Sequence, residues 1–397
     1  MSSEFRIVHK VFTSCAQPCK AALPIVWRKE STVKHWNRVL CYAALGLAPL
    51  AAQDAGVNSY IQTNLVSDVS GLATHTDPNL INAWGIAFGG SGPWWVNAAE
   101  TGLSLVYDGN GNPYPPNSPL VVTIPPPAGG GPSVPTGIVF NSTSDFPLAS
   151  ARDRSAPAGS TGTPALFLFA SARGTISGWN TGTSAVLKVT TPGAVYLGLT
   201  LGQLNGQNVL YAANFVAGGT INAFDGNFNP ISLPAGAFTD SMIPSDYAPF
   251  NVENIGGSIY VMFAEVGPNG DEVHGAGLGY VDKFGPDGTL QLRLQHGDWM
   301  NAPWGVAMAP SFGFGALSRR ILVGQFGGGQ IASFNARTGA FEGLMNGTNG
   351  SPVQIDGLWG IRFGNGGSAG SPRELFFAAG INDEADGLFG KLTSSGR

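Results

Sequence analysis

Short apolar segments recur six times along the chain, and each has the length and composition of a buried β-strand. The six copies cover residues 83–88, 135–140, 196–201, 249–254, 303–308 and 358–363. A glycine occupies the third position of five copies, and Asn251 occupies it in the fourth copy. The starts of the copies lie 52 to 61 residues apart. Such a period is typical of a repeat protein that builds several strands into each unit.

Further strands follow each copy in the same order. The pattern predicts second strands at 94–98, 165–170, 209–213, 258–264, 320–325 and 374–379. A third strand carries a glycine five residues before an aromatic residue, as in Gly102 and Tyr107, although the sixth copy has Leu392 in the aromatic place. Turns rich in Asp, Asn and Gly come next. Fourth strands are predicted at 120–124, 185–190 and 290–295.

Six copies of a four-stranded antiparallel unit predict an all-β, six-bladed β-propeller formed by one domain, residues 57–397. The sixth copy ends after its third strand. We therefore expect residues 60–66, which precede the first copy, to supply the missing outer strand of the last blade. This closure ties the two ends of the domain together and removes a free sheet edge. Trp84, Trp304 and Trp359 are expected to pack between neighbouring blades.

The composition agrees with this fold and excludes others. Glycine and proline number 58 and 28 among 397 residues, whereas charged residues make up only 11%. A helical bundle or a coiled coil would be rich in charged helix formers and poor in glycine. A hydrophobic fraction of 43% argues against disorder. The net charge of −5 is unlike that of a nucleic-acid-binding protein, so no nucleic acid is expected as a partner.

Residues 1–56 form a separate N-terminal extension. Basic residues between positions 28 and 38 precede an apolar run at 39–50, and small residues follow it. This order predicts a secretory signal, with a buried N-terminal helix as the alternative. We expect a secreted or periplasmic protein without a transmembrane segment, because no apolar run reaches 18 residues. All three cysteines precede residue 42, so the remaining domain depends on no disulfide.

Several segments carry a family resemblance. They are 65–69, 76–80, 82–85, 301–305, 355–360 and 382–390, the last reading Asn-Asp-Glu-Ala-Asp-Gly-Leu-Phe-Gly. Over residues 58–393 the chain resembles an uncharacterised family of bacterial exported β-propeller proteins, and its blades are similar to NHL repeats. The resemblance implies export and no established activity. Some members carry a PEP-CTERM sorting tail, which is missing from residues 391–397, so that form of anchoring is not expected.

Polar residues gather on one predicted face of the propeller. The loops that enter the inner strands share this face with the loops that join second to third strands. Ten of the 25 acidic residues are placed there, and they either attract cations or simply solvate long loops. The candidate ligand-binding residues, on this face or in the central channel, are Asn82, Asn214, Asn251, Asn254, Glu265 and Asp356. Strand alternation allows only one of Glu253 and Asn254 to line the channel.

One loop imitates the start of a calcium-binding loop. Asn382, Glu384 and Asp386 place oxygen-bearing side chains at alternate positions before a glycine, so Ca²⁺ is a candidate cofactor. The loop departs from the EF-hand, because its twelfth residue is Thr393 and no flanking helices are predicted. The alternative is that Asp and Asn side chains cap the turn.

The sequence favours a binding protein over an enzyme without deciding between them. We expect a monomeric, exported β-propeller that binds an unknown ligand or protein through its loop face. The alternative is a divalent-metal-dependent, lactonase-like hydrolase or lyase with its site at the channel mouth, by analogy of fold. Catalytic residues are not assigned. The G-x-S-x-G match at 366–370 lacks the strand–turn–helix context of a nucleophile.

Overall fold

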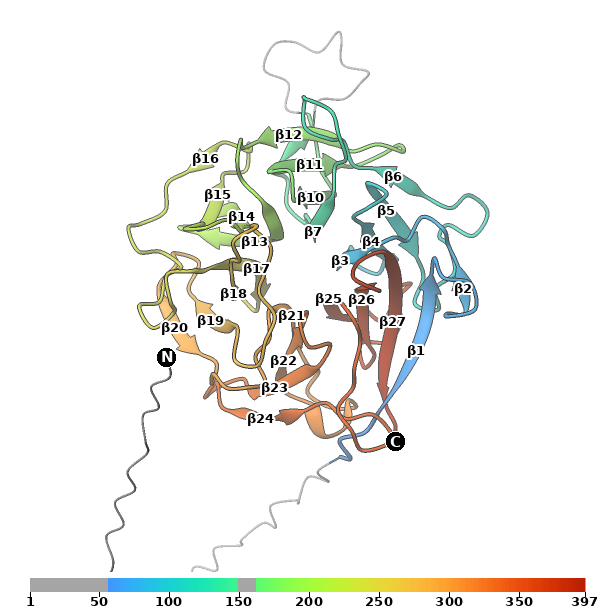
Figure 1. Ribbon diagram of the computed structural model, residues 1–397. Coiled ribbons are helices and arrows are strands. Elements are labelled where there is room, and N and C mark those ends of the chain that lie inside the picture. The colour runs from blue at the N-terminus through green and yellow to red at the C-terminus, as the bar shows by residue number, and fades with distance from the viewer. Residues whose placement is uncertain (1–55, 149–161, 397) are drawn as a thin grey trace, which may run out of the picture. The chain divides into compact units, whose positions relative to one another are not determined.

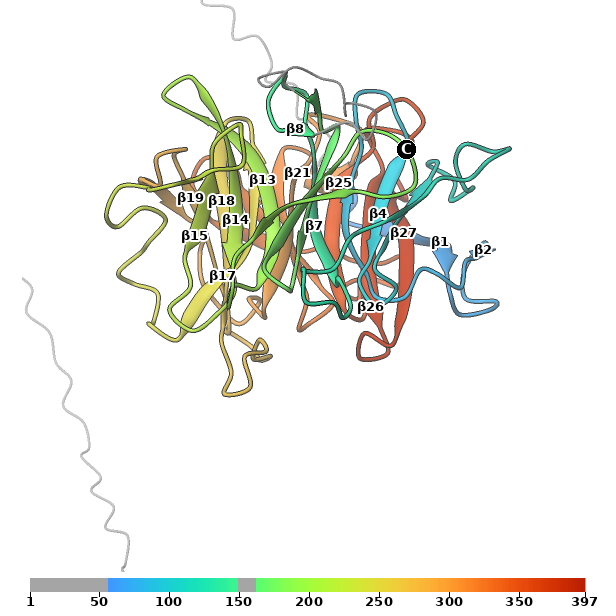
Figure 2. The ribbon, with the colours of Figure 1, turned by 90° about the horizontal axis from the view of Figure 1, so that it is seen from above.

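Six antiparallel sheets, each built on four main strands, stand around a common axis and form a six-bladed β-propeller (Figure 1). The predicted fold class is therefore confirmed. The computed structural model describes residues 56–148 and 162–396, so the predicted signal at 39–50 lies outside the described residues. Figure 2 shows the propeller turned by 90°, with the strands running from one face to the other. In the part of the chain that is described, no helix is long and apolar enough to cross a membrane.

The first three blades run outward from the inner strand in chain order, apart from a small hairpin inserted in blade 2. Blade 1 contains β3 (Ala83–Ala87), β4 (Trp94–Ala98), β5 (Leu103–Tyr107) and β6 (Val121–Thr123). Blade 2 contains β7 (Pro135–Phe140), β10 (Phe167–Ser171), β11 (Thr175–Trp179) and β12 (Val186–Thr190), with the hairpin β8 (Pro147–Leu148) and β9 (Thr163–Pro164). Blade 3 contains β13 (Tyr196–Leu204), β14 (Gln207–Asn214), β15 (Ile221–Phe224) and β16 (Pro230–Ile231).

The last three blades follow the same order, and the sixth ends in the predicted closure. Blade 4 contains β17 (Tyr247–Ile255), β18 (Ser258–Glu265), β19 (Tyr280–Phe284) and β20 (Leu290–Arg293). Blade 5 contains β21 (Pro303–Met308), β22 (Arg320–Gln325), β23 (Ile331–Asn335) and β24 (Phe341–Leu344), with a 3-10 turn η1 (Gly315–Leu317). Blade 6 contains β25 (Leu358–Phe363), β26 (Leu375–Ile381), β27 (Asp386–Ser394) and β1 (Tyr60–Ser67), to which β2 (His75–Thr76) adds.

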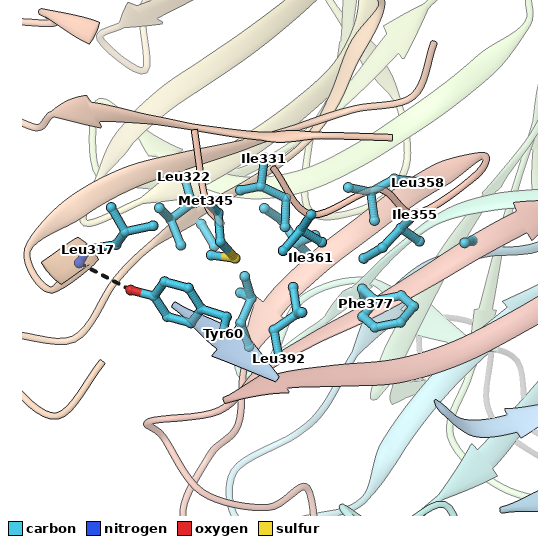
Figure 3. Close-up of a cluster of buried hydrophobic side chains, with 14 of the residues drawn as sticks. Tyr60, Leu317, Leu322, Ile331, Met345, Ile355, Leu358, Ile361, Phe377 and Leu392 are labelled. Atoms are coloured by element: carbon cyan, nitrogen blue, oxygen red, sulfur yellow. Dashed lines mark hydrogen bonds between the residues drawn. The ribbon is translucent and has the colours of Figure 1, made fainter. Parts of the chain in front are cut away.

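Strand β1 closes the ring by pairing antiparallel with β27, from Tyr60 opposite Ser394 to Ser67 opposite Leu388. Tyr60, the first residue of β1, also connects blade 6 to blade 5. The Tyr60 hydroxyl donates to the carbonyl oxygen of Phe314 (2.8 Å) and accepts from the backbone N–H of Leu317 (3.2 Å). Figure 3 shows the second of these bonds beside the apolar side chains that fill the space between the two blades. The closure is therefore held by both backbone pairing and buried contacts.

The glycines at the third position of the inner strands lie where neighbouring blades come closest. A Cβ on Gly305 would lie 2.5 Å from the carbonyl oxygen of Trp359. The same closeness to the next blade is found at Gly85, Gly137, Gly198 and Gly360. In blade 4, Asn251 takes this position and its Nδ2 donates to the carbonyl oxygen of Trp304 (2.7 Å). The repeated glycine is thus a requirement of close backbone approach around the axis.

The sequence pattern did not reveal every strand. The outer strands β16 and β24 were not predicted, and β16 has only two residues, one of which is a proline without a backbone donor. Short edge strands carry few apolar residues, because one of their faces is in water. Their sequence signal is therefore weak, and the missing strands do not alter the number of blades.

Candidate functional site

The central channel is closed near the side that we call the loop face, which is formed by segments such as 352–357 and by turns such as 382–385. Trp359 stacks on Trp84 and on Phe326, with 3.7 Å between ring centroids in both pairs. Trp304 meets Trp359 edge-on at 5.8 Å. The tryptophans therefore pack against one another across blade boundaries. The rings of Trp84, Trp304, Phe326 and Trp359 together fill the mouth of the channel on the loop face.

Charged side chains occupy the channel farther along the inner strands. Glu253 of blade 4 and Arg362 of blade 6 form an ion pair across the axis, with 2.5 Å between Oε1 and Nη2. Burial raises the pKa of Glu253, while the Arg362 guanidinium opposes that rise. The cavity that remains on the axis, which Asn251 also lines, holds about 20 Å³. This is room for one or two water molecules and not for an organic ligand.

A larger hollow opens on the loop face over blades 5 and 6. It holds about 230 Å³. We call it the acidic pocket, and its lining residues are Glu272, His274, Phe326, Gly327, Asp356, Gly357, Gly380, Asp383 and Glu384. They come from the long loop after β18, the turn after β22, the segment before β25, the end of β26 and the turn between β26 and β27. Segments distant in sequence thus place four carboxyl groups around one hollow.

The turn between β26 and β27 holds Glu384 in an uncommon backbone conformation. Asn382, Asp383 and Glu384 have φ values of 56°, 52° and 65°, three consecutive non-glycine residues in the left-handed region. Such residues cost free energy and persist only where surrounding contacts enforce them. One contact is the backbone N–H of Asn382, which donates to Asp356 Oδ2 at 2.8 Å. Another is Asn382 Nδ2, which donates to Asp386 Oδ2 at 2.7 Å.

The Glu384 carboxyl is half protonated near neutral pH. Burial and the negative charges of Glu272 and Glu100 raise its pKa to about 7, although the N–H groups of Asn82 and Trp359 oppose the rise. Glu384 Oε1 is buried and has no hydrogen-bond partner among the described residues. The carboxyl therefore has a free acceptor and is sensitive to any further charge that enters the pocket.

Two other titratable residues of the lining form a pair. His274 Nε2 lies 3.1 Å from Glu272 Oε1, and this contact raises the pKa of His274. The imidazole ring meets Phe326 edge-on, with 5.2 Å between centroids. A protonated His274 is thus bound to one of the four carboxylates, and the other three have no cationic partner in the acidic pocket.

The structure brings together only some of the residues selected from the sequence. Asp356 and Glu384 line the acidic pocket, and Asn82 lies behind Glu384. Asn214 instead accepts from the backbone N–H of Val195 at 2.9 Å. Asn254 donates to the carbonyl oxygen of Leu201 at 2.7 Å and so joins blade 4 to blade 3.

Glu265 ends β18 and lies beside Tyr247, whose pKa is raised to about 12 by burial first and by Glu265 second. Of the three residues selected as calcium ligands, two lie together and the third lies in the acidic pocket. Asn382 donates to Asp386, whereas Glu384 is the residue that lies in the pocket. Within residues 56–148 and 162–396, no three His, Cys, Asp or Glu side chains are grouped to hold one metal ion.

The sequence reasoning did not select Glu272, His274, Asp383 or Phe326 as site residues. The first three lie in loops that follow second strands, so the repeat assigns them to the loop face, but nothing in their spacing distinguishes them from other polar loop residues. Phe326 directly follows the second strand of blade 5, a position where other blades carry residues as different as Ala99 and Phe215. Only the folded arrangement shows that it forms a wall of the pocket.

The fold and the pocket define a six-bladed β-propeller with an acidic, partly aromatic hollow on its loop face. The chain belongs to the same family as the uncharacterised proteins R648 and L690 of Acanthamoeba polyphaga mimivirus. It is 32% identical to R648 over 380 residues, which cover 90% of this chain and 87% of R648. It is 32% identical to L690 over 349 residues, which cover 83% of this chain and 84% of L690. These relatives are viral, whereas the predicted resemblance was to bacterial proteins.

Solved structures align with the chain at low identity, and no family model matches it. Virginiamycin B lyase from Staphylococcus aureus aligns at 14% identity with a TM-score of 0.47, over 84% of this chain and 99% of that one. A protein of unknown function from Bacteroides thetaiotaomicron aligns at 11% identity with a TM-score of 0.47, over 84% of this chain and 76% of that one. At these values the similarity carries no argument about activity.

Proposed function

We propose that this protein is a binding propeller whose acidic pocket holds a small ligand or a side chain of a partner protein. The axial cavity holds about 20 Å³, whereas the acidic pocket holds about 230 Å³. Of these two, only the acidic pocket can hold a small organic group. Two other hollows among the described residues hold about 410 and 390 Å³, so volume alone does not select the acidic pocket. The observation that carries the proposal is its lining, in which four carboxyl groups, an imidazole and an aromatic ring from distant segments surround one hollow. The strained turn that presents Glu384 supports the same assignment, because such strain concentrates at functional sites.

The alternative of a metal-dependent hydrolase or lyase at the channel mouth has less support. Aromatic rings fill that mouth, and the carboxyl groups near it are spread around the acidic pocket. A catalytic divalent cation needs several oxygen or nitrogen ligands that converge within about 2–2.6 Å of one point. The arrangement therefore favours recognition of a larger group.

A pocket-filling variant tests the binding proposal. His274→Trp places a larger ring in the acidic pocket, and His296→Trp makes the same change on the same face but outside the lining residues. We expect small-molecule hits from ligand-observed NMR to bind the wild type and His296→Trp but not His274→Trp. Circular dichroism checks that both variants fold. Hits that bind His274→Trp as well as the wild type would place the binding site elsewhere.

We also propose that the protein is exported and acts as a monomer. Support comes from the basic cluster followed by the apolar run at 39–50 and from the small residues after it. Expression of the full chain in a bacterial host, followed by N-terminal sequencing of the exported product, is expected to give a start near Gln53. Retention of the uncleaved chain inside the cell would contradict export. Light scattering of the purified domain measures its oligomeric state.

A further inference from the structure

The acidic pocket has an excess of negative charge. Glu272, Asp356, Asp383 and Glu384 line it, and His274 is the one side chain of its lining that can carry a positive charge. That charge is already paired with Glu272. A concave site with several carboxylates and low-dielectric walls concentrates cations. The expected ligand therefore carries positive charge.

A second observation, independent of the charge count, points to a ligand at Glu384. Asn82 is only 1% exposed, and its Nδ2 has no hydrogen-bond partner within the described part of the chain. Glu384 Oε1, which belongs to the lining of the pocket, is likewise buried without a partner, and the nearby Asn82 amide lowers the pKa of Glu384. A buried donor left without a partner costs free energy. An ammonium would donate to the unpartnered Glu384 Oε1 and favour the ionised carboxylate, which in turn can accept from Asn82.

The walls of the pocket favour an organic cation over a metal ion. Phe326, stacked on Trp359, forms an apolar wall, and three glycines expose backbone beside it. Metal ions require oxygen or nitrogen ligands that converge on one point, and no such group of three His, Cys, Asp or Glu side chains is present in the described ranges. An ammonium on a methylene chain donates in three directions to dispersed carboxylates, while its stem packs on the ring.

We propose that the acidic pocket recognises a primary alkylammonium group, carried either by a free aliphatic diamine or by a lysine side chain of a partner protein. This inference rests on the proposed binding function and specifies its ligand. Glu384 accepts from the ammonium, and Asn82 donates to Glu384 and so positions it. Phe326 packs against the methylene stem, and Asp356 and Asp383 extend the negative surface toward solvent.

The recognition depends on pH because Glu384 must ionise to bind the cation. The charged groups around it are Glu272 and His274 after β18, Glu100 after β4, Asp356 before β25 and Asp383 on its own turn. With a pKa of about 7, about one tenth of Glu384 is ionised at pH 6 and about nine tenths at pH 8. Affinity is therefore expected to rise about ninefold between these values, and binding near pH 7 should release protons.

Isothermal titration of the purified protein with 1,5-diaminopentane tests this inference, with 1,5-pentanediol as the uncharged analogue. Capped lysine represents the side chain of a partner, and calcium chloride tests a metal ion. We expect the diamine or the capped lysine to bind and the diol not to bind. Glu384→Gln is expected to weaken binding about tenfold at pH 8 and to remove most of its pH dependence. Asp298→Asn removes the same charge outside the lining and should bind as the wild type does.

The outcomes separate the inference from the function on which it rests. Equal affinity for the diamine and the diol, or binding of calcium in preference to both amines, would overturn the alkylammonium assignment. Failure of both amines, together with other hits that His274→Trp abolishes, would refute the cation and leave the binding function standing. If no compound of any charge depends on His274, the binding function fails as well. Proton release, measured in buffers of different ionisation enthalpy, must disappear in Glu384→Gln.

Discussion

Asp282→Asn should make the protein more stable at neutral and alkaline pH. Asp282 lies on β19 and is 2% exposed. Its carboxyl lies against that of Asp240, which accepts both guanidinium bonds of Arg293. Burial, followed by the charge and hydrogen bond of Asp240, raises the pKa of Asp282 to about 8. In the folded protein Asp282 is therefore a neutral acid that donates its proton to Asp240.

The size of the effect follows from the two protonation states. In the unfolded chain Asp282 ionises near its ordinary pKa of about 3.9, so the folded state binds an extra proton between that pH and about 8. Because the folded-state pKa is raised, stability is fully present below the unfolded pKa and falls as the pH rises toward 8. A difference of about four pH units corresponds to an upper limit of about 6 kcal/mol at pH 8. The side-chain amide of asparagine can donate the same hydrogen bond to Asp240, and it has no titrating proton to lose as the pH rises.

Urea unfolding at pH 4, 6 and 8 measures the difference directly. We expect Asp282→Asn and the wild type to agree within about 1 kcal/mol at pH 4, and the variant to gain several kcal/mol by pH 8. Asp287→Asn is the control in the same blade. Bonds from Thr289 lower the pKa of Asp287, so its contribution is lost as the pH falls. If the unfolding free energies of Asp282→Asn and the wild type changed in parallel from pH 4 to pH 8, a proton shared by Asp282 and Asp240 would be refuted.

Three other substitutions test the ring itself by chemical denaturation. Tyr60→Phe leaves two buried backbone groups without partners and should cost about 1–3 kcal/mol; an unchanged midpoint would show that β1 does not need this anchor. Arg362→Met leaves the Glu253 carboxylate without a cationic partner at the axis and should cost about 2–3 kcal/mol of stability. Adding Glu253→Gln to the same chain should restore most of that loss. Equal losses of stability in the single and double variants would contradict the ion pair. Gly305→Ala forces a Cβ against the next blade and should cost about 3 kcal/mol of stability or prevent folding. Gly129 has open space around it, so Gly129→Ala should leave the stability unchanged. Similar losses in the two variants would contradict the argument from close packing.

The number of blades and their closure were predictable because they depend on a pattern that repeats. Five of the six inner strands have glycine at the third position, where the next blade comes close, and the same position recurs six times around the axis. Asn251 broke the pattern and was correctly recognised as exceptional. Asn251 lines the axial cavity, and its amide replaces a close backbone contact with a hydrogen bond to the carbonyl oxygen of Trp304. A repeat therefore reveals what its copies share, but not how one copy compensates for a difference.

The acidic pocket was only partly predictable because sequence assigns residues to a face and not to a place around the ring. Asn214 ends the second strand of blade 3 and Glu384 follows the second strand of blade 6, so both are assigned to the loop face. Asn214 bonds to the backbone of its own blade, whereas Glu384 enters the pocket. The difference arises from the left-handed turn at 382–384 and from the long loop that brings His274 across from blade 4. Neither feature has a periodic signal.

The acidic pocket is asymmetric, because its lining comes from the seam between the first and last blades and from one long loop of blade 4. Gly380, in the second strand of blade 6, lines the pocket, and a Cβ there would collide with the side chain of Asn82. The missing Cβ allows Asn82 of blade 1 to reach Glu384, so the seam between the first and last blades supplies the buried donor. On the other side, the loop from blade 4 supplies the Glu272 and His274 pair. Pocket formation therefore depends on ring closure by β1 and β27. Tyr60→Phe lies outside the pocket lining, so it should reduce the fraction of protein that binds the diamine without changing the affinity of the folded fraction.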